Sequence, residues 1–216
     1  MEANPKLFRE VLEKFHSFIG SGQLTLLNQG IWSEPKVLTF YSNLDNDHWS
    51  SFDPAYGCRN GTLYETLQIE CTCLGPILER FGVPRYVKID IEGADSLVLA
   101  ELARLGIRPP FVSVEEYGVS SIDALHAIGY EKFQITAQGD KRWSVPPKQP
   151  REGRYVSRTF GGQDSGLFGR ELPGKWMSYA DARTAFITNV RREDGTYVGP
   201  QGEWFDVHAA ASEEMP

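Results

Sequence analysis

The sequence has few cysteines, no long hydrophobic run and no excess of basic residues. Its three cysteines, Cys58, Cys71 and Cys73, offer neither a second pair at metal-ligand spacing nor an even-numbered set for a disulfide framework. We therefore expect reduced, buried thiols at 71 and 73 in preference to zinc or redox chemistry. No stretch of about 18 apolar residues occurs, and the first residues do not form a basic segment followed by an apolar one. These absences predict a cytoplasmic protein without a membrane partner.

The charge balance argues against a nucleic-acid partner. The chain has 22 Lys and Arg against 29 Asp and Glu, a net charge of -7, and its basic residues are scattered along the sequence. Binding to phosphate backbones needs a positive surface. We therefore expect the partner to be a small molecule or a glycan acceptor.

Hydrophobic periodicity divides most of the chain into alternating strands and helices. Asn4-Pro5 before an apolar stripe predicts a capped helix that is closed by Gly20. Strands are predicted over 23–28, 37–41, 64–73, 86–91, 111–115 and 130–135, with helices over 74–81, 95–105 and 121–128. Such alternation indicates an α/β fold with a mostly parallel sheet. From residue 146 Gly and Pro become frequent, so we expect a core over 1–145 and an irregular C-terminal extension over 146–216, packed on that core.

The segment Lys88-Ile89-Asp90-Ile91-Glu92-Gly93-Ala94-Asp95 carries the most chemical information. A buried-type strand here delivers two carboxylates to its carboxyl end, and a glycine lets the chain turn into a helix. Alternation in a strand places Asp90 and Glu92 on one face, where they can share a hydroxyl, a cationic group or a metal ion. The alternative is that Glu92 or Asp95 only caps the following helix.

This segment resembles the signature of the FkbM methyltransferases. Three other stretches agree with it: Glu2-Ala3-Asn4-Pro5 is similar to the end of the family's second strand, 111–117 fits its Glu-Tyr-bearing fifth strand, and 165–179 with 204–208 resemble C-terminal segments of some members. The resemblance implies a Rossmann-like class I methyltransferase fold. It also implies that the family's first strand and glycine-rich motif lie upstream of Met1, so that this chain is an N-terminally truncated form. An incomplete sheet of that kind is expected to self-associate.

The activity implied by the resemblance is transfer of a methyl group from S-adenosylmethionine to a hydroxyl on a sugar, glycan or natural product. Asp90 is the expected base, with Glu92 second, and no metal ligand is assigned. Glu2, Asn28 and Asp90 are expected at the donor, where Glu2 accepts hydrogen bonds from the ribose hydroxyls. The side chains expected at the acceptor are those of His48, Ser50, Ser51, Glu115, Glu116 and Tyr117.

Several of these residues also have interpretations without a functional role. Taken alone, Glu2 is a disordered terminal acid, Asn28 a turn former, and His48 with its neighbours a solvated loop. His208 could reach over the site from the tail, but packing of Trp204 and Phe205 against the core is the safer interpretation of that segment.

Two other functions are open. One is a non-catalytic, truncated methyltransferase-like module that needs an upstream segment or a partner chain. The weaker one treats Asp90, Glu92 and Glu115 as ligands of a divalent cation in a hydrolase or glycosyl-transfer site.

Overall fold

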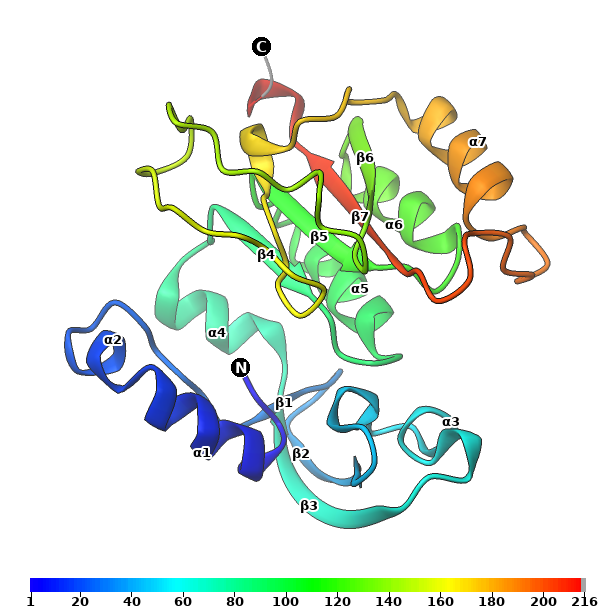
Figure 1. The fold of residues 1–216 in the computed structure, drawn as a ribbon. Helices are drawn as coiled ribbons and strands as arrows, with labels where there is room; N and C mark the ends of the chain where they lie inside the picture. Colours follow the sequence, from blue (N-terminus) through cyan, green and yellow to red (C-terminus); the bar gives the residue numbers. More distant parts are fainter. Residues whose placement is uncertain (215–216) are drawn as a thin grey trace. The chain divides into compact units, whose positions relative to one another are not determined.

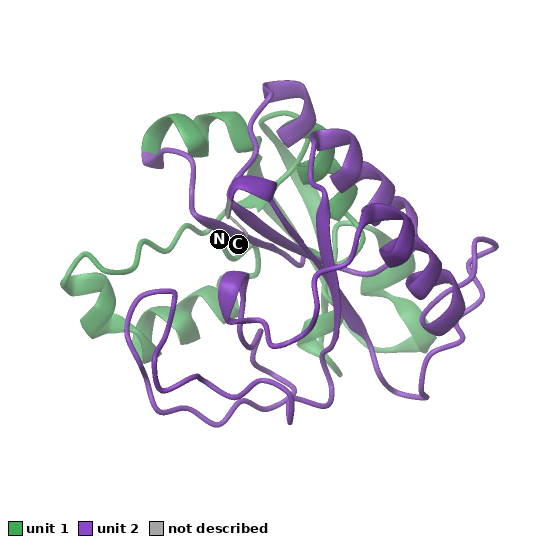
Figure 2. Cartoon of the chain, turned by 90° about the horizontal axis from the view of Figure 1, so that it is seen from above, with its two compact units in different colours: residues 1–80, 91–101 green, residues 81–90, 102–216 purple. Residues whose placement is uncertain are grey.

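A computed structural model of the chain describes residues 1–214 (Figure 1). The chain divides into two compact units, drawn green and purple in Figure 2. Unit 1 comprises residues 1–80 and 91–101, and unit 2 comprises 81–90 and 102–216, of which the last two lie outside the described residues. The expected division between 1–145 and 146–216 stays a prediction. Within residues 1–214, every helix is too short or too polar to cross a bilayer.

Unit 1 begins with two helices, α1 (Pro5–Lys14) and α2 (His16–Gly20). The predicted cap is confirmed, because the Asn4 side chain accepts a hydrogen bond from Lys6 N at 2.9 Å and Pro5 occupies the first helical position. The predicted strand over 23–28 is wrong. That segment is irregular, and the first strand is the short β1 (Gly30–Ile31).

The sheet of unit 1 has three strands in the order β1-β3-β2. Strand β2 (Lys36–Asn43) runs antiparallel to β3 (Tyr64–Thr72) in a register from Lys36 opposite Cys71 to Asn43 opposite Tyr64, and β1 runs parallel to β3. The three cysteines are not disulfide-bonded. The other α-helices that contribute to unit 1 are α3 (Pro54–Gly57), α4 (Leu74–Phe81) and most of α5 (Asp95–Leu105).

The sheet of unit 2 has four strands in the order β4-β5-β7-β6. Strands β4 (Tyr86–Ile89) and β5 (Phe111–Glu115) are parallel, whereas β7 (Phe205–Ala210) is antiparallel to both β5 and β6 (Lys132–Ala137). Helix α6 (Ser120–Ile128) ends at Gly129, whose φ of 107° is easily reached only by glycine. Helix α7 (Tyr179–Asn189) lies beside α6 and contacts β6 (Figure 1).

The expectation of a Rossmann-like, mostly parallel sheet is therefore wrong. The structure has two small sheets in which antiparallel pairing predominates. The physical reason in unit 2 is that the segment 205–210, expected in an irregular extension, supplies a strand between β5 and β6. Hydrophobic periodicity reports which residues form strands, but it does not report strand direction or order.

The two faces of this sheet differ in chemistry. Alternation and the strand register place Lys88, Ser113, His208 and Gln134 in one row on the same face, with Glu115, Asp206 and Thr136 in the next row. The opposite face carries Ile89, Val112, Val114, Val207, Ala209 and Phe133, all buried. The segment 138–176 covers part of the polar face, where Tyr86 stacks on Phe168 with 4.3 Å between ring centroids.

The N-cap of α1 gives a stability test. Replacing Asn4 by Ala removes the acceptor for Lys6 N and the side-chain bond to Ser42 Oγ (3.2 Å), so the free energy of unfolding is expected to fall by about 1 kcal/mol or more. Asn4→Asp keeps the capping acceptor and is expected to lose less. Urea denaturation measures both, and an Ala variant as stable as the parent would contradict the capping role.

Candidate functional site

The carboxyl edge of the unit 2 sheet gathers charged side chains. Because β7 is antiparallel to both β5 and β6, strands β4, β5 and β6 all point the same way. Their carboxyl ends bring Asp90, Glu115 and Gln138 to one edge, and β7 begins there with Phe205 and Asp206. Ligands of open α/β sheets are commonly bound outside the carboxyl ends of parallel strands. This edge is therefore the candidate site.

Lys88 connects a buried carboxylate with an exposed one. Its Nζ lies 2.8 Å from Asp206 Oδ1 and 3.2 Å from Asp90 Oδ2. The Asp206 side chain is 1% exposed, whereas that of Asp90 is 49% exposed. Burial alone would lower the pKa of Lys88, but the Asp206 and Asp90 carboxylates raise it above its usual value. Lys88 therefore stays protonated. Its ammonium group also fixes the position of the Asp90 carboxylate.

Only one of the two carboxylate oxygens of Asp206 has a partner in this arrangement. Its Oδ2 atom is buried and has no hydrogen-bond partner among residues 1–214. A buried carboxylate oxygen without a partner is energetically costly, so its ionised form depends on Lys88. The sequence alone assigned no role to Lys88 or Asp206. The alternation of polar and apolar residues in Phe205-Asp206-Val207-His208 is nevertheless a strand signal that could have located Asp206.

Behind the edge lies a chain of polar side chains. Lys141 Nζ donates to Gln138 Oε1, Gln138 Nε2 donates to Thr136 Oγ1 at 2.9 Å, and Thr136 Oγ1 lies 3.0 Å from His208 Nε2. Burial, followed by the nearby charges of Lys88 and Lys141, lowers the pKa of His208 to about 3. His208 is therefore neutral near pH 7. It lies inside the sheet, and the idea that it reaches over the site from the tail is wrong.

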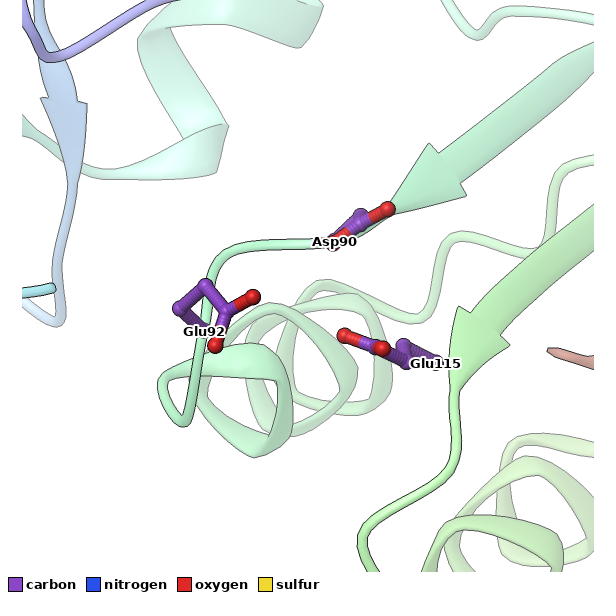
Figure 3. A group of neighbouring side chains, drawn as sticks. All are labelled: Asp90, Glu92 and Glu115. Carbon is purple, nitrogen blue, oxygen red and sulfur yellow. The ribbon is translucent and has the colours of Figure 1, made fainter. Parts of the chain in front are cut away.

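Asp90 and Glu115 lie at the ends of adjacent parallel strands, as Figure 3 shows. A carboxylate oxygen of each lies within 4.8 Å of the other. Tyr117 Oη donates to Glu115 Oε2 at 2.9 Å, so three of the predicted residues meet at this edge. The predicted acceptor residue Glu116 points elsewhere: it is 4% exposed and accepts from Arg191 Nε at 3.0 Å and Nη2 at 3.1 Å.

Glu92 lies on the turn after β4 (Figure 3). It belongs to unit 1, and its contacts described here are with residues of that unit. Its φ is 46°, an uncommon value for a residue with a side chain. Arg59 Nη2 lies 2.9 Å from Glu92 Oε2, and Ser51 Oγ donates to the Glu92 carbonyl oxygen at 2.7 Å. The next residue must be glycine, because its φ is 96° and a Cβ there would lie 2.7 Å from the Tyr56 ring. Ser51, expected at the acceptor, is thus a buried support of the turn.

Asp95 supports the same turn from the other side. Its carboxylate accepts long hydrogen bonds from Ile91 N (3.4 Å) and Gly93 N (3.3 Å), and the residue is 4% exposed. Asp95 therefore stabilises the turn that precedes α5 through N–H groups outside the helix, and its capping of α5 stays a prediction.

The predicted donor residues of unit 1 contact each other. Asn28 Nδ2 donates to the Glu2 carbonyl oxygen at 2.9 Å, and Glu2 Oε1 accepts from Asn4 N at 2.7 Å. Burial raises the pKa of the Glu2 carboxyl. Of the two remaining acceptor residues, Ser50 accepts from Asn43 N at 3.1 Å. His48 is exposed, with its Nε2 atom 3.8 Å from an Asp47 oxygen.

The buried ion pair gives the first prediction from this site. Lys88→Met leaves Asp206 buried without its cation, so the free energy of unfolding at pH 7 is expected to fall by about 3 kcal/mol or more. Asp206→Asn removes the buried charge and is expected to cost less, and Lys88→Met combined with Asp206→Leu is expected to recover part of the loss. Denaturant unfolding of the three variants measures this ranking. Equal losses in the two single variants would contradict it.

His208 gives the second prediction, on pH. The unfolded chain protonates this histidine near pH 6.5, whereas the native protein does so only near 3, so the native state binds fewer protons between these values. The contribution of His208 to the free energy of unfolding is therefore complete above pH 6.5. Below that pH, acidification removes about 1.4 kcal/mol of it per pH unit. His208→Gln is expected to flatten the curve of unfolding free energy against pH between 6.5 and 4.5. His16→Gln, at an exposed position, should leave the curve unchanged.

Comparison with known proteins adds no neighbour to this description. No family model, no curated protein and no solved structure matches the chain. The resemblance to the FkbM methyltransferases therefore rests on the motif from Lys88 to Asp95 and the three stretches that agree with it.

Proposed function

We propose that the chain is an S-adenosylmethionine-dependent methyltransferase that methylates a hydroxyl on a sugar, glycan or natural product, in the cytoplasm. The sequence support is the motif Lys88–Asp95. The observation that carries the proposal is the exposed carboxylate of Asp90, held by Lys88 at 3.2 Å and close to Glu115 at the carboxyl edge of the sheet. The predicted parallel sheet is not part of the support, because it proved wrong.

Glu2 has the chemistry needed for the donor's ribose. One of its carboxylate oxygens is fixed by Asn4 N at 2.7 Å, and Asn28 holds its backbone carbonyl. No hydrogen bond to Oε2 is found within residues 1–214, so this oxygen remains for a ribose hydroxyl. S-adenosylmethionine, when bound, supplies a methyl group on a positively charged sulfur.

Asp90 is the proposed base. In the transfer, the acceptor oxygen forms a bond to the methyl carbon, the carbon–sulfur bond breaks with its electron pair going to sulfur, and the hydroxyl proton passes to the Asp90 carboxylate. Lys88 keeps that carboxylate in place. Glu115 and Tyr117 are joined by a 2.9 Å hydrogen bond that the tyrosine hydroxyl donates, so both can accept hydrogen bonds from further hydroxyls of the acceptor.

Glu92 is less suited to proton transfer than Asp90. Its carboxylate pairs with Arg59 at 2.9 Å, and its side chain is 17% exposed against 49% for Asp90. The same pairing weakens the alternative of a divalent cation. Arg59 already supplies positive charge to Glu92 and Lys88 supplies it to Asp90, and hard cations need several uncommitted oxygens. We therefore assign Glu92 to holding the turn.

The proposal predicts separate effects on donor binding and on chemistry. Calorimetric titration with S-adenosylmethionine should detect saturable binding, weakened about tenfold in Glu2→Gln because a charged hydrogen-bond acceptor is lost. Glu13→Gln, an exposed change of the same charge on α1, is the control. Asp90→Asn should lower transfer of labelled methyl to a panel of sugars and glycans by about 100-fold or more, measured at saturating donor so that any loss of donor affinity does not contribute.

Two outcomes would contradict the proposal. Absence of donor binding by the chain favours the non-catalytic module. Donor binding with unchanged methyl transfer in Asp90→Asn rejects Asp90 as the base.

A further inference from the structure

Unit 2 contains a pocket that the proposed function does not use. It lies between the start of β6, the loop around residues 145–151 and the segment 170–176, with a volume of about 600 Å³. Known small-molecule pockets have volumes of about 300–1,000 Å³. Lys132 is the first residue of β6, so the pocket lies at the amino end of this strand, whereas Asp90 and Glu115 lie at the carboxyl edge.

The residues that line this pocket are mostly basic, whereas the chain as a whole is acidic. Acids outnumber bases by 29 to 22 in the whole sequence, but four basic residues and one acid line this cavity: Lys132, Arg151, Arg170, Lys175 and Glu171. Cationic groups around a concave surface raise the local concentration of anions. The local reversal therefore points to a negatively charged occupant.

The single acid in the wall offsets only one of the four positive charges, and its carboxylate accepts hydrogen bonds from backbone groups. Glu171 Oε1 accepts from the backbone N–H groups of Arg151 and, at 2.7 Å, of Glu152. Arg170 in turn pairs with Glu152 at 3.3 Å. In the described part of the chain no carboxylate comes within ion-pair distance of Lys132 or Lys175. Two ammonium groups thus remain for a ligand.

A backbone bridge fixes the wall that carries these lysines. Phe133 N donates to Met177 O at 3.0 Å and Met177 N donates to Phe133 O at 2.8 Å, which ties the start of β6 to the segment after Lys175. Trp176, the residue before Met177, also lines the pocket and is partly buried. A pocket lined by a tryptophan and two lysines suits a ligand with an aromatic or apolar part and an anionic group.

We propose that this pocket binds a small organic anion, through Lys132 and Lys175 at its phosphate or carboxylate and through Trp176 at its apolar part. The site is separate from the carboxyl edge. The proposal of an anion pocket does not depend on whether the chain transfers methyl groups.

The test uses the full chain and two aromatic anions, phenyl phosphate and benzoate, with benzyl alcohol as the neutral analogue. Titrations followed by amide chemical shifts in NMR should give saturable shifts near Lys132 and Trp176 for at least one anion. The stronger of the two anions identifies the ligand group as phosphate or carboxylate. Affinity should fall at least tenfold in Lys132→Gln/Lys175→Gln and should decrease with added salt.

Lys6→Gln/Lys14→Gln, in exposed positions of α1, carries the same change in net charge and should leave the affinity unchanged. Trp176→Leu should reduce the preference for phenyl phosphate over inorganic phosphate. Equal losses in the two lysine pairs, equal binding of benzyl alcohol, or no binding of either anion would overturn the proposal.

Discussion

The organisation of unit 2 depends on neutralising one buried carboxylate. Asp206 is almost fully enclosed, and its charge is compatible with the interior only because Lys88 lies 2.8 Å away. The two residues come from β7 and β4, which are separated in the sheet by β5. The ion pair therefore joins strands that do not exchange backbone hydrogen bonds, and it leaves the second carboxylate bound by Lys88, that of Asp90, facing outward.

The irregular segment 138–176 has a related role. Its residues provide cover for a sheet face that carries Ser113, Gln134 and Thr136 in place of aliphatic side chains. Tyr86 stacks on Phe168, and Lys141 reaches both Gln138 and the Ser165 carbonyl oxygen. Side chains make the hydrogen bonds of this face: Ser113 Oγ bonds to Tyr86 Oη, and Thr136 Oγ1 accepts from Gln138 Nε2 at 2.9 Å. Gln134 Nε2, in contrast, is buried with no hydrogen-bond partner within residues 1–214.

Local signals in the sequence predicted a good part of this structure. The cap at Asn4, the stop at Gly129 and most strand segments follow from residue chemistry near each position, and so does the convergence of Asp90 and Glu115, which needs only adjacent parallel strands. Strand direction and order do not follow, because they are decided by contacts between residues far apart in the sequence. Lys88 and Asp206 are separated by 118 positions, so no local pattern could indicate their pairing. The ion pair of Glu116 with Arg191 and the hydrogen bond from Ser51 to the Glu92 carbonyl oxygen also join residues far apart in the sequence, so local patterns could not indicate them.

The central place of β7 also affects how the protein is made. Translation at about 5–20 residues per second leaves an interval on the order of ten seconds between the synthesis of β4 and that of β7. During that time β5 and β6 each present an edge that β7 later fills, and Lys88 lacks its buried counter-ion. Unpaired edges of this kind can pair with other chains. The nascent protein is therefore more exposed to aggregation until residues 205–210 have been synthesised and have paired with β5 and β6.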